Sequence, residues 1–571
     1  MTELKKLESI KKEFNKYKKI TTFTSAIRLV IGAIFIVMII LLISFSGYIF
    51  YGLLSSIVFL IFIIFSLSTN CLYKKYNHLK VLMNVYDNHE KRRNLKLDYL
   101  YDSGQEFIDK EDYKELDLDL FGKKSIYQYL SVCKTKIGKS ILAKALKGEY
   151  KRDKDYTDLV MKMSQTEDTL SLEASIQSFT STKEINYDEL NSVNSNKIPF
   201  KFTYLIPLLC FISTIVYLIL SLTLKLNIAL ILIPILLTFL TSKMFLKNPI
   251  FNLKAGLYYD VSCNYLDFIN HLKEYEIDNN YFKTLKQEIL EEENALKKMK
   301  LLYLILSLRQ NIIFNVVFNA IFVLDFSTMI FFNIESKSSK KLEGLFNNVG
   351  EIETLISLSN IGCDNEYATI PNDSDNIEVL DMKHPLVKNC VSNSITFNGG
   401  IILTGSNMSG KTTFMRTLGV NLVLKNAGGI VLAKKFNAPR MNIYTSLRAN
   451  DLLQEGISTF YAEILRMKKM NQAIKTEKCF ILVDEIFKGT NAYERISASL
   501  KVIDKFNQYN VNFIISTHDF ELCDANNISN YHFNEEYSND NKISFDYKIK
   551  SGKSESKNAL YLLKMADIID E

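Results

Sequence analysis

This sequence of 571 residues lacks several features that mark secreted, metal-binding or strongly nucleic-acid-binding proteins. Its eight cysteines are scattered with no Cys-x-x-Cys pair, which argues against a disulfide framework or a zinc site and favours a reducing cytoplasm. The net charge is only +6, which alone gives no argument for nucleic acid. Trp is absent, which we interpret as compositional bias. The N-terminus is polar and charged ("KKLESIKKEFNKYKK"), so no cleavable signal is expected.

Charged residues are missing from the long apolar stretch 29–67. A membrane-spanning helix needs roughly 20 apolar residues, and this stretch holds two such lengths with "SFSGY" at 44–48 as the turn. Lysines and Arg28 precede it, and further lysines follow it, so the positive-inside tendency places both ends in the cytoplasm. We therefore predict a cytoplasmic basic N-terminus at 1–28 and a transmembrane hairpin at 29–68.

A second apolar stretch repeats this design at 202–240, where two apolar runs are joined near Lys225 and flanked by lysines. It predicts a second transmembrane hairpin. The alternative for the two stretches together is a pair of hairpins buried in a protein core. A third stretch, 301–334, carries polar residues about every four positions. That spacing favours a helix packed within protein, with entry into the membrane as the alternative.

The remaining sequence divides into two kinds. Residues 76–200 and 250–362 are predicted to be helical, whereas short apolar β-like runs alternate with helices beyond 376. This alternation predicts an α/β domain with a mainly parallel sheet at 376–571. The expected fold is thus an α/β P-loop NTPase head preceded by an all-α region that carries the two hairpins.

The sequence "GGIILTGSNMSGKTTF" contains a complete P-loop between a strand (401–403) and a helix. Glycines let the backbone wrap phosphates, and the exposed N–H groups hold the anion. Lys411 is expected to reach the β- and γ-phosphates, and Thr412 to bind Mg²⁺. The predicted ATP-binding residues are Gly405, Ser406, Asn407, Met408, Ser409, Gly410, Lys411, Thr412 and Thr413.

Two further strand ends complete the predicted ATP site. A strand at 480–483 ends in Asp484 and Glu485, where Asp484 would support Mg²⁺ and Glu485 would orient or deprotonate water. Another apolar strand ends at Thr517 and His518, so His518 could sense the γ-phosphate or position water. Both sets lie at the carboxyl ends of strands, where parallel sheets bind ligands.

With these motifs in order, the sequence resembles the MutS family of ATPases. The match runs through "HPLV" (384–387), "TGSNMSGKTTFMRTLGV", "GISTFYAEI", "ILVDEIFKGTNAYE" and "STHDFEL". The Asn-Met pair makes the P-loop more specific than a generic one. Residues 122–148 and 342–361 resemble the start and end of the family's core lever domain, and "KISFDYKIKSG" resembles strands that close the ATPase domain.

The resemblance implies an ABC-like ATPase head that works as a homodimer. Ser458 and Thr459 would act on the nucleotide of the other subunit, and Gly489 and Thr490 would lie near the dimer interface. Ser458 or Thr459 could also simply be the N-cap of a helix, with Phe460 and Ile464 buried behind it. No N-terminal mismatch-reading domain and no Phe-x-Glu wedge are evident, and the position of a clamp insertion is hydrophobic.

The sequence therefore predicts a multi-pass ATPase anchored in the lipid bilayer of the cell membrane, using ATP and Mg²⁺, with both termini and the ATPase domain in the cytoplasm. Mismatch-specific or other DNA binding is implied only by the family. An ABC-type transporter with fused membrane helices is the alternative, although the Gly-Gly signature of transporter ATPases is missing. A scaffold that binds ATP without turnover is a third possibility, against which the intact acidic residues argue.

Overall fold

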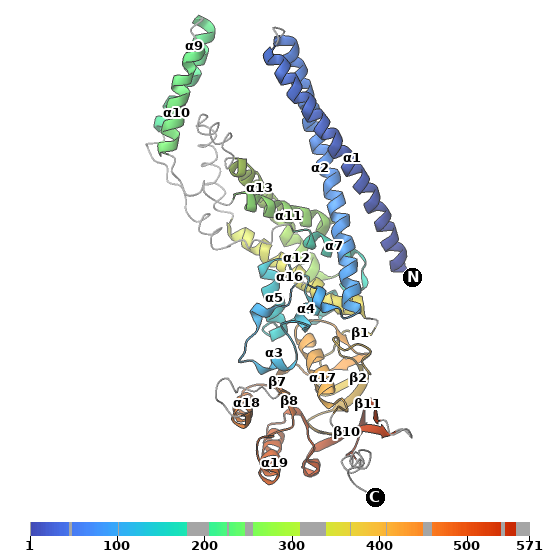
Figure 1. Ribbon diagram of the computed structural model, residues 1–571. Helices are drawn as coiled ribbons and strands as arrows, with labels where there is room; N and C mark the ends of the chain where they lie inside the picture. Colours follow the sequence, from blue (N-terminus) through green and yellow to red (C-terminus); the bar gives the residue numbers. More distant parts are fainter. Residues whose placement is uncertain are drawn as a thin grey trace.

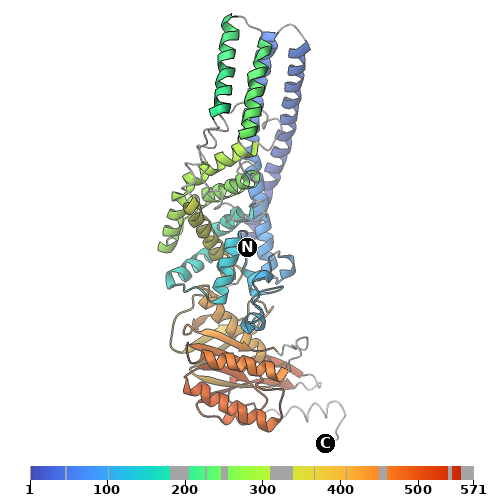
Figure 2. The ribbon, with the colours of Figure 1, turned by 90° about the vertical axis from the view of Figure 1, so that its left-hand side faces the viewer.

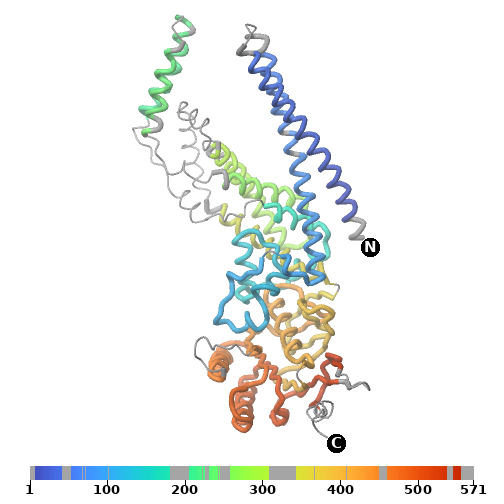
Figure 3. Tube along the Cα trace, viewed as in Figure 1, coloured from blue at the N-terminus to red at the C-terminus, as the bar shows by residue number. Residues whose placement is uncertain are grey.

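A computed structural model of the chain describes residues 2–44, 48–100, 102–179, 205–224, 228–245, 255–308, 339–365, 367–406, 408–448, 459–537 and 543–554. The molecule is elongated. Two sets of apolar helices stand at one end, an α/β domain forms the other end, and a helical region lies between them (Figures 1 and 2). The chain trace in Figure 3 passes from the blue hairpin through the green helices to the orange and red α/β domain.

The predicted first hairpin corresponds to two long helices, α1 (Thr2–Ser44) and α2 (Tyr48–Arg93). They lie side by side, with ring stacking between Phe35 and Phe59 at 5.1 Å and between Phe14 and Tyr76 at 5.2 Å. By length and composition, both helices contain a segment apolar enough to cross a membrane. The apolar window of α1 is 0% buried and that of α2 is 12% buried, so these side chains form surface rather than core.

The predicted second hairpin contains α9 (Leu205–Leu224), the short η4 (Ile228–Ile231) and α10 (Leu232–Phe245). These apolar helices are shorter than α1 and α2. Of the third apolar stretch, only residues 301–308 are described, as the end of α13 (Glu293–Leu308). There Tyr303 is buried against Tyr258. Residues 309–334, whose polar positions carried the prediction, lie outside the described part.

The central region is helical, as predicted. Its described elements after α2 are η1 (Leu97–Tyr99), η2 (Gln105–Phe107), α3 (Tyr113–Asp117), α4 (Ile126–Leu130), α5 (Lys136–Lys147), α6 (Lys154–Gln165), α7 (Asp168–Gln177), α11 (Ala255–Glu274), α12 (Asn280–Glu291), α13 and α16 (Ser339–Asp364). Capping explains several of their starts, because Thr135, Asp153 and Asn279 each accept a hydrogen bond from a first-turn amide.

Helix α16 is the centre of this region. Its apolar side chains from Val349 to Ile361 are buried, and it packs against α5, α6 and α12. Buried Glu353 fastens it to the start of α5 by accepting hydrogen bonds from the amides of Lys134 (2.9 Å) and Thr135 (3.1 Å) and from the Thr135 hydroxyl. Burial raises the pKa of Glu353 to about 7 despite these hydrogen bonds.

The α/β domain contains a six-stranded sheet in the order β11-β10-β4-β9-β8-β7. All neighbouring strands are parallel except the pair β10 and β11 at the edge. The strands are β4 (Gly400–Thr404), β7 (Asn442–Ser446), β8 (Cys479–Asp484), β9 (Asn512–Ser516), β10 (Ile528–Tyr537) and β11 (Ile543–Ser551). β4 and β9 are buried along their whole length, as parallel strands covered on both faces are.

Helices α17 (Lys411–Asn426), α18 (Thr459–Ala473), α19 (Ala492–Gln508) and the short η8 (Phe520–Asp524) complete the main part of this domain. A small antiparallel sheet, β3-β2-β6, and a two-stranded pair, β1-β5, lie beside it. Their strands are β1 (Ala368–Thr369), β2 (Ile377–Met382), β3 (Asn393–Phe397), β5 (Val431–Leu432) and β6 (Lys435–Asn437). The helical region followed by a mixed, mainly parallel sheet confirms the expected α/β NTPase architecture.

Candidate nucleotide-binding site

The P-loop joins β4 to α17 in the predicted strand-loop-helix arrangement. Gly405 and Gly410 have φ angles of 139° and 108°, a region that favours glycine. A Cβ atom at Gly405 would also lie 2.8 Å from the carbonyl oxygen of Phe533 on β10. Met408 is 85% exposed, and Asn407 lies outside the described residues. Glycine is therefore required at both ends of the loop for conformational and steric reasons.

Lys411 is held inside this loop. Its Nζ donates hydrogen bonds to the carbonyl oxygens of Gly405 (2.7 Å) and Ser406 (2.8 Å). Burial lowers the pKa of Lys411, while the carboxylates of Asp484 and Glu485 act in the opposite direction. The ammonium group thus lies where loop amides and the start of α17 can hold phosphate.

The other predicted loop residues have separate roles. Ser409 closes the loop by donating from Oγ to the carbonyl oxygen of Ser406 (2.8 Å). Thr413 is exposed, and its carbonyl oxygen accepts a hydrogen bond from the Thr417 hydroxyl. Neither contact involves the ammonium group of Lys411. Ser409 therefore supports loop geometry, whereas Thr413 lies on the exposed face of the first turn of α17.

Thr412 and Asp484 come together, as predicted for magnesium ligands. Thr412 Oγ1 donates to Asp484 Oδ2 at 2.6 Å, and the Ser516 hydroxyl hydrogen-bonds to Asp484 Oδ1. Hydroxyl and carboxylate oxygens are the donors that Mg²⁺ prefers. The residue types and their proximity therefore fit a magnesium site at the edge between β8 and β9.

Glu485 follows directly at the end of β8. Its backbone has a φ of 52°, and its amide donates to the carbonyl oxygen of Ser516 (3.0 Å). Its two carboxylate oxygens lie 3.3 Å from His518 Nε2 and 3.2 Å from Lys488 Nζ. The hydrogen bond from His518 and the charge of Lys488 lower the pKa of Glu485 to about 2, despite partial burial. An ionised carboxylate of this kind is suited to orienting water.

The structure also shows supporting residues that the sequence reasoning missed. Ser516 pairs with Asp484 in the β8-β9 register, so its position beside the acidic end was available from the strand alignment. Arg495 forms a two-point ion pair with Asp519, at 2.7 and 2.6 Å, which fastens α19 to the turn after His518. No local sequence pattern predicts the ion pair between Arg495 and Asp519.

The predicted trans-acting residues lie on two neighbouring segments. Helix α18 begins at Thr459, and the turn containing Gly489 packs against its first turn so closely that a Cβ there would lie 2.6 Å from Phe460 Cβ. Thr490 Oγ1 donates to Glu494 at 2.8 Å. Ser458 lies outside the described residues.

The expectation for the apolar residues of α18 is only partly met. Phe460 is half-buried against Phe487, with ring centroids 6.2 Å apart. Ile464, however, is 38% exposed, so the prediction of its burial is wrong. The helical spacing is correct, but Ile464 lies on a face that the described part of this chain does not cover.

Comparison with known sequences supports this assignment of the domain. The family model MutS domain V matches residues 401–571. DNA mismatch repair protein MutS from Persephonella marina is 30% identical over 39% of this chain and 27% of its own length. The Bacillus licheniformis protein of the same name is 30% identical over 40% of this chain and 28% of its own length.

The protein of that name from Fusobacterium nucleatum is 32% identical over 32% of this chain and 21% of its own length. The chain thus covers between 21 and 28% of the length of these three relatives. The likeness falls on the C-terminal part that carries the P-loop and the acidic strand end. Residues 401–571 of this chain are therefore similar to domain V of MutS proteins.

Proposed function

We propose that this protein is a membrane-anchored MutS-like ATPase that hydrolyses ATP in a dimer of two copies. The main support is the meeting of three strand ends: Lys411 in the loop after β4, Asp484 after β8, and His518 after β9. A catalytically silent ATP scaffold would not need the Glu485 carboxylate to be positioned by His518 and Lys488. This arrangement favours turnover.

The proposed mechanism follows from the position of each side chain. Loop amides and Lys411 bind the phosphates, with the positive end of α17 adding to the attraction. Magnesium, held by Thr412 and Asp484, would neutralise charge that develops on the phosphates. Glu485 orients the attacking water, and His518 holds that carboxylate in place. Positioning and charge stabilisation are the main tasks in phosphoryl transfer.

The shared dimer site is proposed from the family resemblance, together with two observations of this chain. Gly489 packs against the first turn of α18, and Met408 of the P-loop and Tyr493 at the start of α19 are 85% and 84% exposed. In the proposed dimer, Ser458 and Thr459 of one copy act on the nucleotide of the other. ATP held between the copies would draw the ATPase domains together and move the helical regions.

Membrane anchoring is supported by apolar side chains that the described protein leaves on its surface. Leu29 of α1 is 74% exposed, Ile64 of α2 is 67% exposed, and Leu232 of α10 is 66% exposed. Figures 1 and 2 place the apolar parts of α1, α2, α9 and α10 at the end farthest from the α/β domain. We propose that these helices form the two predicted hairpins, with both termini and the ATPase domain in the cytoplasm.

DNA is the proposed partner of the ATPase cycle, because the relatives are named DNA mismatch repair proteins. The net charge of +6 adds little to this proposal. The discriminating measurement is the ATPase rate of the detergent-solubilised protein with homoduplex, mismatched and branched DNA. Stimulation by one DNA form would identify the preferred structure, and no response to any form would refute a DNA-coupled cycle.

Two substitutions test the ATPase itself. Lys411→Ala should abolish ATP binding, whereas Glu485→Gln should preserve ATP binding and stop hydrolysis. Equal hydrolysis by the parent protein and Glu485→Gln would show that Glu485 has been assigned wrongly. In liposomes, ATPase stimulation by a transported solute without any response to DNA would instead support the transporter alternative.

A further inference from the structure

Five charged side chains connect the helical region to the α/β domain, and we refer to them as the joint cluster. Asp117 and Asp119 come from the end of α3 and the following turn. Arg416 comes from α17, Arg448 follows β7, and Arg466 belongs to α18. The two acids therefore contact three elements of the ATPase domain at a single place.

Asp117 fixes the end of β7. Its carboxylate accepts hydrogen bonds from the amides of Leu447 (2.9 Å) and Arg448 (3.1 Å). Asp117 is 1% exposed, and Arg466 approaches it at 3.9 Å while donating to the carbonyl oxygen of Arg448 at 2.8 Å. The carboxylate thus satisfies two backbone amides that follow the strand and would otherwise be buried without a partner.

Asp119 links the same strand end to the P-loop helix. Arg448 Nη2 lies 2.7 and 2.6 Å from its two carboxylate oxygens, and Arg416 Nη1 lies 3.5 Å from one of them. Asp119 has a φ of 51°, an uncommon conformation for a residue other than glycine. Burial lowers the pKa of Arg416 and nearby Arg448 lowers it further, so Asp119 compensates two crowded cations.

The joint cluster is close in sequence to residues of the nucleotide site. Arg416 lies four residues after Thr412 on α17, and therefore on the same face of that helix. Ser446 at the end of β7 pairs with Val483, the residue before Asp484. The cluster therefore fixes the helix that carries one proposed magnesium ligand and the strand beside the one that carries the other.

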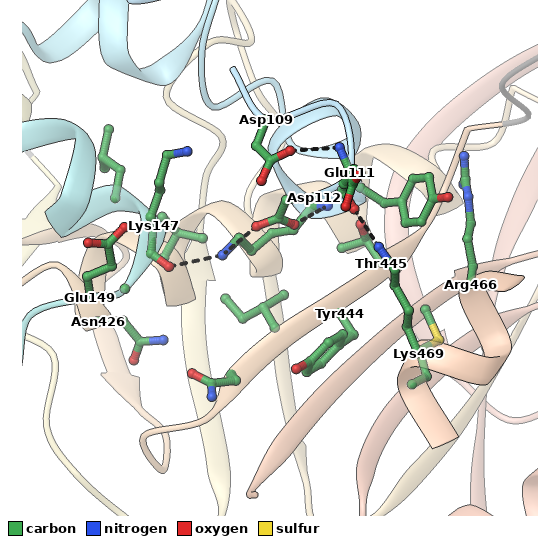
Figure 4. A pocket seen from close by; sticks show the side chains of 18 residues that line it. Asp109, Glu111, Asp112, Lys147, Glu149, Asn426, Tyr444, Thr445, Arg466 and Lys469 are labelled. Atoms are coloured by element: carbon green, nitrogen blue, oxygen red, sulfur yellow. Dashed lines mark hydrogen bonds and ion pairs between the residues drawn. The ribbon is translucent and has the colours of Figure 1, made fainter. Parts of the chain in front are cut away.

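Apolar side chains (Leu118 and Leu447) are buried beside the joint cluster, and its side toward Arg466 faces a polar space. A cavity of about 500 Å³ lies next to it, between the α3 and α5 segments and the β7 and α18 segments (Figure 4). Two contacts border the cavity: Lys469 Nζ donates to the carbonyl oxygen of Glu111 (3.0 Å), and Lys114 Nζ donates to that of Lys147 (3.1 Å). Directional charged contacts therefore add to the apolar packing of Leu118 at this joint.

We propose that Asp117 and Asp119 are positioning residues for ATP hydrolysis, through which the helical region sets the alignment of α17 and β7 at the nucleotide site. This inference rests on the proposed ATPase function. The acids touch no nucleotide-binding side chain directly. They act through Arg416, Arg448 and the backbone after β7, so movement of the helical region changes the alignment of the magnesium ligands.

The test uses full-length protein in detergent with Asp119→Asn, which keeps the side-chain shape and removes the charge. Its kcat should fall by about tenfold, since misplacement by groups remote from the reacting atoms can cost up to about a hundredfold. The Kd for ATP should stay within about twofold, because Lys411 and the loop are untouched. Asp119→Glu should recover much of the lost kcat.

The matched control is Glu378→Gln, which removes a carboxylate paired with Lys435 at 2.6 Å on the small sheet. It should leave kcat unchanged. Parental kcat in Asp119→Asn, or an equal loss of ATP affinity and kcat, would overturn the inference. So would failure of Asp119→Glu to improve on Asp119→Asn.

A second measurement separates this inference from the ATPase proposal. In nucleotide-free protein, hydrogen exchange of α17 and β7 should become faster in Asp119→Asn, while that of α12 should not change. Unchanged exchange of α17 and β7 would overturn the inference whether or not the parent hydrolyses ATP. Absence of parental hydrolysis above the Lys411→Ala level, with faster exchange at α17 and β7, would refute the ATPase proposal and retain the positioning contacts.

Discussion

Replacing His89 with alanine should weaken the attachment of α2 to the helical region by about 3 kcal/mol, the scale of a broken buried pair. His89 Nδ1 lies 3.0 Å from Asp364 at the end of α16, and its Nε2 lies 3.0 Å from Glu173 on α7. All three side chains are at most 1% exposed. Alanine would leave the two carboxylates buried without the imidazolium between them.

The magnitude follows from the charge state of His89. Burial lowers its pKa, but Asp364 and Glu173 outweigh that effect and raise the pKa from 6.5 to about 9. At about 1.4 kcal/mol for each pKa unit, this corresponds to about 3 kcal/mol. Because the folded protein raises the pKa of His89, the stabilisation decreases with increasing pH. It is fully present below pH 6.5 and is lost as the pH rises through about 9.

Hydrogen exchange of peptides from α2, α7 and α16 measures this effect locally, which avoids a single unfolding temperature for a protein of several parts. At pH 7, protection in His89→Ala should fall by about two orders of magnitude, since 1.4 kcal/mol corresponds to tenfold. The control, His532→Ala, removes a ring that contacts the Gly552 carbonyl at 2.9 Å in the α/β domain. Equal protection in the parent and His89→Ala, or parental protection that is constant from pH 7 to 10, would refute the reasoning.

Three further substitutions probe the nucleotide site. Asp484→Asn should raise the Mg²⁺ concentration for half-maximal ATPase by about tenfold, and an unchanged value would contradict its role as a ligand. Gly489→Ala should lower turnover, because its Cβ would lie 2.6 Å from Phe460 Cβ and such overpacking typically costs about 1–3 kcal/mol; Gly344→Ala, where nothing lies within 4 Å, is the control. Ser458→Ala should reduce turnover without weakening ATP binding by the monomer, and additive activities in mixed dimers would contradict a shared site.

Local motifs predicted much of the nucleotide site. The strand, glycine loop and helix around Lys411 are determined by residues that are close together in the sequence. The apolar run before Asp484 likewise identifies the end of a buried strand. Because the carboxyl ends of parallel strands meet at one edge, the proximity of Glu485 and His518 was predictable as well. The β4, β8 and β9 boundaries differ from the predicted runs by only a residue or two.

The contacts between distant segments were not predictable in this way. Asp117 and the amide of Leu447 are separated by 330 residues, and neither has a sequence signature that names the other. His89 likewise looks like an ordinary residue of a charged helix until α7 and α16 surround it. The prediction that Ile464 is buried was wrong for the same reason. Helical periodicity defines a face of the helix but does not determine what covers that face.

Helix α2 joins the apolar end of the molecule to its interior as a single rod. Its 46 residues correspond to about 69 Å at 1.5 Å per residue. The His89 contact ties this rod to Asp364, the last residue of α16, shortly before β1 begins at Ala368. In a bilayer, a tilt of α2 by about 5° would displace one end relative to the other by about 6 Å. Since helices tilt to match bilayer thickness, the proposed membrane anchoring implies that lipid chain length changes the orientation of the ATPase domain.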